Sequence, residues 1–322
     1  MPLPDWARAC GAPLFTAAIR TSPADFRVSE TLGWDFSADG EHDYLWLQKT
    51  SANSEWVARQ LARHADVPAR DVGYSGLKDR HAITTQWFSV PRWHAPDWSA
   101  LDVEGVEVLD VQRHNRKLRR GAHQSNAFRI VLRGDGIEQY ADALEKRLSL
   151  IREQGVPNYF GEQRFGRDGG NVALAEAWAS GKRLPRHKRS LAISTMRSLL
   201  FNEQLDARVR AGTWNALLPG DKANLDGTGS VFEFDLVDDE LQSRLDTMDV
   251  HPAGILAGEN SGLGPEVWQE ALGKARVEEG RRSFRLVVRD LDWSAEPGAV
   301  TVSFSLGRGA FATSVLREIC DT

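Results

Sequence analysis

The sequence has few cysteines and no metal-binding motif. Its 322 residues include only Cys10 and Cys320, near opposite ends, and no CxxC pair, so the chain cannot be built on a disulfide framework. The eight histidines form no HxxxH or HxH pair. Carboxylates alone can bind Mg²⁺, but no spacing in the chain favours a metal site, and we expect none.

The sequence also lacks a long apolar run. No stretch approaches the roughly 20 apolar residues that cross a bilayer. The start, MPLPDWARACGAPLF, has no basic region followed by an apolar one, as a secretory signal would have. Apolar residues make up 41% and charged residues 26%, which excludes a mostly disordered chain, a collagen and a long coiled coil. We therefore expect a soluble cytoplasmic protein of one large or two ordinary domains.

Charge is unevenly distributed along the chain. The net charge of −5 by itself argues against nucleic-acid binding. However, segments 113–120 and 182–189 each contain five basic residues and no acidic one, whereas acidic residues concentrate in 221–249. Local charge determines contacts with phosphate. Each basic segment is therefore either a phosphate-binding surface or an ordinary solvated one, and charge alone does not choose between them.

Hydrophobic periodicity predicts strands near both ends of the chain and helices between them. Residues 42–49 alternate with period two, with Leu45 and Leu47 on one side, as in a strand. A helix is predicted over 54–65, with Ser54 as its N-cap. Further helices are expected over 136–153, 171–180, 190–212 and 265–279, and further strands over 84–90, 101–114, 126–134, 283–294 and 299–315. This order favours an insertion inside a domain that is built from both ends of the chain.

The most unusual segment is GYSGLKDRH, residues 73–81, on a loop between a predicted helix and a predicted strand. Its glycines permit backbone conformations closed to other residues. Asp79 lies between Lys78 and Arg80, whose positive charges are expected to keep its carboxylate ionised. Such a carboxylate can act as a nucleophile or base. It can also cap a turn and pair with its neighbours, and the pattern alone favours this second interpretation.

Other segments combine aromatic, glycine and polar residues. Residues 158–167, NYFGEQRFGR, suit base stacking and phosphate contact, or they form a packed hinge between domains. Phe311, in GRGAFATS, either stacks on a base or fills a core. Phe128 and Ile130 lie on one face of a predicted strand, as in any core strand. The chain has no GxxxxGK[ST], no strand-linked GxGxxG and no GxSxG.

Taken together, these motifs resemble a known family. The matching segments are DFRVSE (25–30), SGLKDRHAITTQWFSV (75–90), KLRRGAHQSNAFRIVLR (117–133), GVPNYFGEQRFGRDGGNV (155–172), RHKRS (186–190) and GAFATSVLRE (309–318). In this order they resemble the TruD family of tRNA pseudouridine synthases. No single motif would suffice, but the set is specific and extends over most of the chain.

The resemblance implies an activity. The family isomerises uridine to pseudouridine, principally at position 13 of tRNA, without a cofactor and as a monomer. Asp79 matches the family's catalytic aspartate and would attack either C6 of the base or C1′ of the sugar. The uridine must first be flipped out, because a stacked base hides both atoms. The two basic segments would then contact RNA phosphates, and segment 221–249 would face away from RNA.

The resemblance also implies roles for other site residues. Phe128 would take the stacking place that a tyrosine holds in other pseudouridine synthases, and Asn126 would hydrogen-bond near the substrate or the aspartate. Arg20 stands where the family commonly has a lysine that pairs with the aspartate. Arginine keeps the positive charge but is planar and forked, so its pairing geometry differs from that of lysine. The remaining substrate-binding residues implied are Phe26, Lys78, Arg164 and Phe311.

The fold implied by the resemblance is α+β, with a mixed, largely antiparallel sheet flanked by helices. Residues 1–155 and 281–322 would form the catalytic domain, and 156–280 would form the family's inserted α/β domain, with RNA between the two.

Two other functions compete with this interpretation. One is an RNA-binding protein of the same fold that has lost catalysis, although Asp79, Asn126 and Phe128 are all present. The other is a glycosidase-like hydrolase with Asp79 and Glu162 as paired carboxylates, which would need a separation of roughly 5–10 Å.

Overall fold

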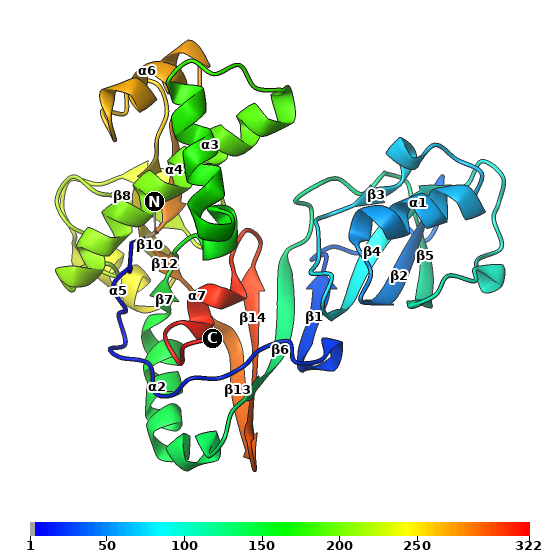
Figure 1. The fold of residues 1–322 in the computed structure, drawn as a ribbon, viewed down its shortest axis with the longest axis horizontal. Helices are drawn as coiled ribbons and strands as arrows, with labels where there is room; N and C mark the ends of the chain where they lie inside the picture. Colours follow the sequence, from blue (N-terminus) through cyan, green and yellow to red (C-terminus); the bar gives the residue numbers. More distant parts are fainter. Residues whose placement is uncertain (1–3) are drawn as a thin grey trace. The chain divides into compact units, whose positions relative to one another are not determined.

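The computed structural model describes residues 4–322, which form two compact units (Figure 1). Unit 1 comprises the residues up to Pro13, Arg147–Val287 and Ala310–Ile319. Unit 2 comprises Leu14–Lys146, Val288–Gly309 and Cys320–Thr322. The expected insertion spans 156–280, whereas the central segment of unit 1 runs from Arg147 to Val287. Unit 1 also includes the N-terminal segment and 310–319. The division of the chain into a catalytic and an inserted domain stays a prediction.

Hydrogen bonds link the two terminal segments of unit 1 to each other and to its central segment. Arg317 donates to the carbonyl oxygen of Trp6 at 2.6 Å. Ser314 Oγ donates to the carbonyl oxygen of Tyr159 at 2.8 Å. Such contacts between distant parts of the chain leave no periodic signal in the sequence, so the periodicity could not predict them.

Unit 2 is built on a mixed, largely antiparallel sheet of eight strands, in the order β13-β14-β6-β1-β4-β2-β5, with β3 also paired to β4. The strands are β1 (Phe26–Thr31), β2 (His42–Thr50), β3 (Gly73–Tyr74), β4 (Ile83–Pro91), β5 (Val106–His114), β6 (Ser125–Arg133), β13 (Arg289–Glu296) and β14 (Ala299–Gly307). Only the pair β1–β4 is parallel. The predicted fold class is confirmed.

Helix α1 (Ser54–His64) covers one face of this sheet beside β2 and β4 (Figure 1). Its buried Val57 and Leu61 pack in one apolar cluster with Leu45 and Leu47 of β2, the two residues that the alternation placed on one side of the strand. The helix was predicted, but its predicted N-cap was wrong. Asn53, not Ser54, is the N-cap, and its side chain accepts a hydrogen bond from the backbone N–H of Glu55.

The sheet register aligns several functional candidates on the α1 face. Lys49 on β2 lies opposite Thr84 on β4. Thr84 is the partner of Val28 on β1, and Val28 lies opposite Phe128 on β6. Because partners in neighbouring strands project to the same side of a sheet, Lys49 and Phe128 belong to one row on one face.

Unit 1 contains helices and two small sheets. Its elements are β7 (Val156–Pro157), α3 (Gly170–Ala179), α4 (Arg186–Arg210), β8 (Lys222–Leu225), β9 (Val231–Glu233), α5 (Asp239–Asp246), β10 (Val250–Leu256), α6 (Glu266–Lys274), β11 (Gly280–Ser283), β12 (Arg285–Leu286) and α7 (Ala312–Leu316). The sheets have the orders β11-β10-β8-β9 and β12-β7. The boundary between the units falls within α2 (Ala141–Gln154).

Two helix boundaries in unit 1 differ from the predicted ones by four or five residues. Helix α4 begins at Arg186, directly after Pro185, so part of the basic segment 182–189 forms its first turn. Helix α6 ends at Lys274, five residues before the predicted end. None of the helices within residues 4–322 combines the length and the apolar character that a membrane span requires.

Candidate active site

Asp79 lies on the loop between β3 and β4, and its carboxylate is half-exposed. Its Oδ2 atom is 3.4 Å from Nη2 of Arg20. The Arg20 guanidinium also lies over the Phe26 ring, 4.3 Å from the ring centroid. Arg20 has a φ of +58°, in the left-handed region that non-glycine residues rarely adopt. Such strain is typical of functional sites and persists only where the surroundings enforce it.

Lys78 contacts a different carboxylate. Its Nζ is 2.6 Å from Oε2 of Glu30, and both side chains are almost completely buried. Arg80 is exposed and, across residues 4–322, forms no ion pair with Asp79. The direct partner of the Asp79 carboxylate is therefore Arg20, which precedes it by 59 positions in the sequence, rather than either sequence neighbour.

Buried polar groups hold the loop that carries Asp79. Ser54 Oγ accepts a hydrogen bond from the backbone N–H of Lys78 at 3.1 Å and donates to Oε1 of Gln86 at 2.6 Å. The side-chain Nε2 of Gln86 in turn donates to the carbonyl oxygen of Gly76 at 3.2 Å. These bonds explain why Ser54 does not cap α1, because its hydroxyl is engaged by the loop.

Ser75 and His123 form a second anchor for the loop. Ser75 Oγ accepts from the backbone N–H of His123 at 2.8 Å and lies 2.5 Å from its Nδ1. Burial lowers the pKa of His123 to about 4, assisted by the nearby charges of Lys78 and Arg308. The imidazole is therefore neutral at pH 7, which allows Nδ1 to accept the hydroxyl proton of Ser75.

Three aromatic rings follow one another on the same sheet face, and the first of them, Phe26, contacts Arg20. The ring centroids of Phe26 and Phe128 are 6.3 Å apart, edge to face. Phe128 stacks on Phe304 at 5.5 Å. Phe26 and Phe304 are buried, whereas Phe128 is only partly so. A chain of contacts therefore leads from Asp79 through Arg20 and Phe26 to the partly exposed Phe128.

Asn126 lies two residues before Phe128 on β6, opposite Glu30 on β1. Its Oδ1 atom is buried, and no group within residues 4–322 donates a hydrogen bond to it. Buried acceptors are nearly always satisfied in folded proteins, so an unsatisfied one calls for an explanation such as a ligand.

Two predicted site residues belong to unit 1. Phe311 precedes α7, and its ring lies 6.1 Å from that of Phe160. Arg164 donates to Ser194 Oγ at 3.0 Å, while its Nε is buried and makes no hydrogen bond within the described part of the chain. Burial lowers the pKa of Arg164. Glu162, the second carboxylate of the hydrolase alternative, also belongs to this unit.

The sequence interpretation missed Lys49, which lies next to the Asp79 loop. A signal existed, because Lys49 continues the Leu45–Leu47 alternation and so falls on the buried side of β2. A lysine at an inward-facing strand position is uncommon, since lysine is almost never fully buried unless paired.

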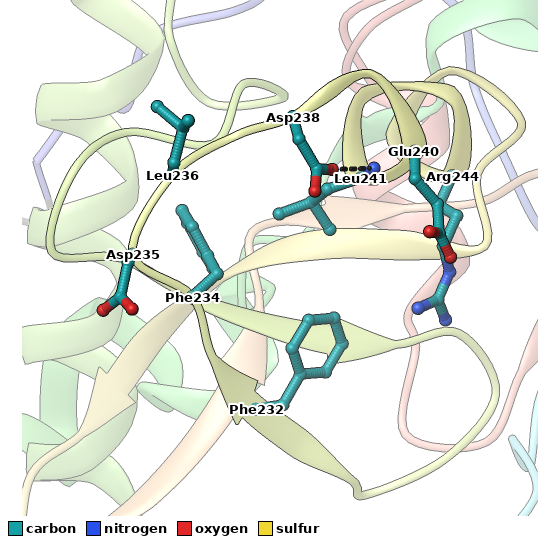
Figure 2. A pocket seen from close by; sticks show the side chains of 8 residues that line it. All are labelled: Phe232, Phe234, Asp235, Leu236, Asp238, Glu240, Leu241 and Arg244. Carbon is teal, nitrogen blue, oxygen red and sulfur yellow. Dashed lines mark hydrogen bonds between the residues drawn. The ribbon is translucent and has the colours of Figure 1, made fainter.

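A separate hollow lies in unit 1 between β9 and α5 (Figure 2). Phe232, Phe234 and Leu236 form its apolar part, and Asp235 and Asp238 are among its acidic residues. None of the predicted site residues lines it. Its acidic character does not suit RNA phosphates. The orientation of segment 221–249 away from RNA stays a prediction. Within residues 4–322 no group of three or more His, Cys, Asp or Glu side chains could hold a metal ion.

Comparison with known proteins assigns the chain to a family. The family model "tRNA pseudouridine synthase D (TruD)" matches residues 9–175 and 173–319. The chain belongs to the TruD family. The resemblance seen in the sequence motifs is thereby confirmed.

Relatives and a solved structure agree with this assignment. A tRNA pseudouridine synthase D of Methylococcus capsulatus is 44% identical over 98% of this chain and 94% of its own length. One of Nitrosococcus oceani is 43% identical over 96% and 92%. A solved structure from Methanosarcina mazei that carries the TruD name superposes with a TM-score of 0.77 and covers 99% of this chain and 98% of its own. Its sequence identity is 19%, so this likeness concerns the fold.

Proposed function

We propose that this TruD-family chain isomerises uridine 13 of tRNA to pseudouridine, with Asp79 as the nucleophile. The observation that carries the proposal is the half-exposed Asp79 carboxylate, held by Arg20 beside the rings of Phe26 and Phe128. The proposal includes action as a monomer in the cytoplasm, where tRNA is available. The relatives named tRNA pseudouridine synthase D support tRNA as the substrate class.

The proposed reaction begins with attack by an Asp79 oxygen on C6 of uracil or on C1′ of the ribose. The bond between N1 and C1′ then breaks, the uracil turns, and C5 forms the new bond to C1′. The bond to Asp79 breaks and regenerates the carboxylate, C5 loses its proton and N1 gains one. All atoms remain and no net oxidation occurs, so the reaction requires no redox cofactor. An ionised carboxylate is needed at the start, and the Arg20 guanidinium lies beside the Asp79 carboxylate at 3.4 Å.

The surrounding residues suit recognition of a flipped base. The partly exposed Phe128 ring offers a face or edge against uracil, since every base has a π-face that stacks on an aromatic side chain. The unsatisfied Oδ1 of Asn126 can accept the N3–H of uracil. We assign Lys78 an indirect role in substrate binding through its ion pair with Glu30.

Basic residues away from the sheet face would bind the RNA backbone. Arg116, Lys117 and Arg119 are exposed, and none forms an ion pair with a carboxylate within residues 4–322. In unit 1, the exposed basic residues of 186–189 occupy the first turn of α4. Positive charge is unfavourable at a helix N-terminus, so bound phosphate would relieve this arrangement. We propose that Arg164 contacts RNA and that Phe311 lies near the bound uridine.

A chemical map of pseudouridine in tRNA tests the proposal. Unmodified tRNA is incubated with the wild-type protein and, separately, with Asp79→Asn, which preserves shape and removes the negative charge. We expect pseudouridine at position 13 with the wild type only, and tRNA affinity within a few-fold for the variant. Tight tRNA binding without conversion by either protein would favour the binding-only function. Loss of both binding and turnover in the variant would instead make Asp79 structural.

A further inference from the structure

Lys49 is a fully buried lysine near the end of β2. Its neighbours on the same side of the strand are Leu45 and Leu47, which belong to the apolar cluster under α1. Across the sheet it lies opposite Thr84 of β4, which is also fully buried. Lys49 therefore follows two buried leucines on the inward side of the strand.

The Lys49 ammonium group bonds to two main-chain carbonyls. It donates to the carbonyl oxygen of Ala52 at 2.7 Å and to that of Asp79 at 3.3 Å. No ion pair joins it to a carboxylate within residues 4–322. Burial lowers the pKa of Lys49 to about 8; the charge of Asp79 opposes this effect and that of Lys78 adds to it.

A purely structural role would not require a lysine here. Burial of an unpaired charge destabilises a fold, and a methionine of similar length could fill the same space among the leucines. Methionine could make neither carbonyl contact, and of the two it is the one with Asp79 that reaches the main chain of the candidate nucleophile. The side chain of Asp79 is held by Arg20, so Lys49 and Arg20 restrain the same residue through different groups.

We propose that Lys49 is a positioning residue for Asp79, holding the main chain of the nucleophile through its carbonyl oxygen while Arg20 engages the carboxylate. This inference rests on the proposed function, because it treats Asp79 as the nucleophile. The charged groups around Lys49 are Asp79 and Lys78 on the loop, with Glu30 of β1 on the far side of Lys78 and Arg20 on the far side of Asp79. No other charged side chain influences Lys49 strongly enough to affect its pKa.

The test compares Lys49→Met and Lys49→Arg with the wild-type protein at full length. We expect Lys49→Met to fold with unchanged or higher thermal stability and to bind tRNA within about twofold, while kcat falls by about 10- to 100-fold, as expected for a misplaced reactive group. Lys49→Arg retains the charge and the donors and should recover part of kcat. Lys222→Met is the control, because Lys222 belongs to unit 1 and pairs with Glu233.

Two readouts separate positioning from a general structural effect. Hydrogen exchange of the backbone amides of 77–81 should accelerate in Lys49→Met and remain unchanged in the control. In the wild type, kcat should decline above about pH 8, as Lys49 loses its charge, and Lys49→Met should lack that decline. If Lys49→Met does not fold, Lys49→Gln is measured in the same way.

Unchanged kcat together with unchanged amide exchange in the folded variant would overturn the inference. The failure of the proposed function gives a different result, in which the wild type forms no pseudouridine in any tRNA. The amide exchange of 77–81 then decides alone whether Lys49 positions the loop, and unchanged exchange would reject that role as well.

Discussion

Arg20 and Asp79 form an ion pair in which the cation, not the carboxylate, has the strained backbone. Nη2 of Arg20 is 3.4 Å from Oδ2 of Asp79, and Arg20 has a φ of +58°. The same guanidinium lies over the Phe26 ring. The backbone conformation of Arg20 and the stacking of its guanidinium on Phe26 therefore restrain the residue at both ends. Together they direct its positive charge toward Asp79.

Replacement of Arg20 should affect chemistry more than binding. For Arg20→Met we expect kcat to fall by about 10- to 100-fold, the equivalent of about 1.4–2.7 kcal/mol of transition-state stabilisation. Arg20→Lys keeps the charge and should retain most of the activity. Single-turnover kinetics on tRNA measures the effect on the chemical step, and a separate affinity measurement gives the effect on tRNA binding. A normal kcat in Arg20→Met would reduce the pair to an ordinary surface ion pair.

Phe128 should matter more for catalysis than for folding. Its ring is only partly buried, so Phe128→Ala is expected to cost about 1–3 kcal/mol of unfolding free energy, less than the roughly 3–5 kcal/mol of a fully buried phenylalanine. The buried Phe304, on which it stacks, provides the matched control as Phe304→Ala. Urea unfolding and turnover are measured for both variants. If Phe128→Ala fails to fold while Phe304→Ala folds, Phe128 is a core residue.

Charge reversal in the basic segment after β5 should weaken RNA binding. For the double variant Arg116→Glu and Lys117→Glu we expect a lower tRNA affinity and a flatter dependence of log K on log salt, by about 0.7–0.9 for each lost phosphate contact. Lys274→Glu serves as the control, because Lys274 is exposed on α6 and pairs with Glu270. An unaltered salt slope would identify 113–120 as ordinary solvated surface.

The buried neutral His123 should make the protein acid-sensitive. Its pKa is about 4 in the folded state, below the ordinary 6.5, so between these values the unfolded chain binds a proton that the folded protein does not. Stability therefore falls as pH decreases through this window, by at most about 1.4 kcal/mol per pH unit from this group.

His123→Asn should show a smaller decrease in stability over this range. The measurement is urea unfolding at pH 7, 5.5 and 4.5. His94→Asn, at an exposed histidine, should behave as the wild type does. Parallel pH profiles for wild type and His123→Asn would mean that other groups control the acid sensitivity.

Local sequence patterns determined much of this protein. The alternation around Leu45 and Leu47 predicted a strand with both leucines on one side, and helical spacing predicted α1 to within one residue. The ordered motifs predicted the family, and with it Asp79 as the candidate nucleophile. These signals are local because periodicity and motif spacing report how a short segment folds and which face it buries.

Only the tertiary structure decided what surrounds Asp79. Lys78 and Arg80 adjoin it in sequence, yet its carboxylate meets Arg20, and Lys49 reaches its carbonyl from a strand 30 positions away. Ser54 was expected to cap a helix, but the folded loop engages its hydroxyl. Strand pairing brings together residues that are distant in the chain, and no local pattern encodes which distant groups will meet. The sequence therefore determined which residue was the candidate nucleophile, and the fold determined which charges hold it.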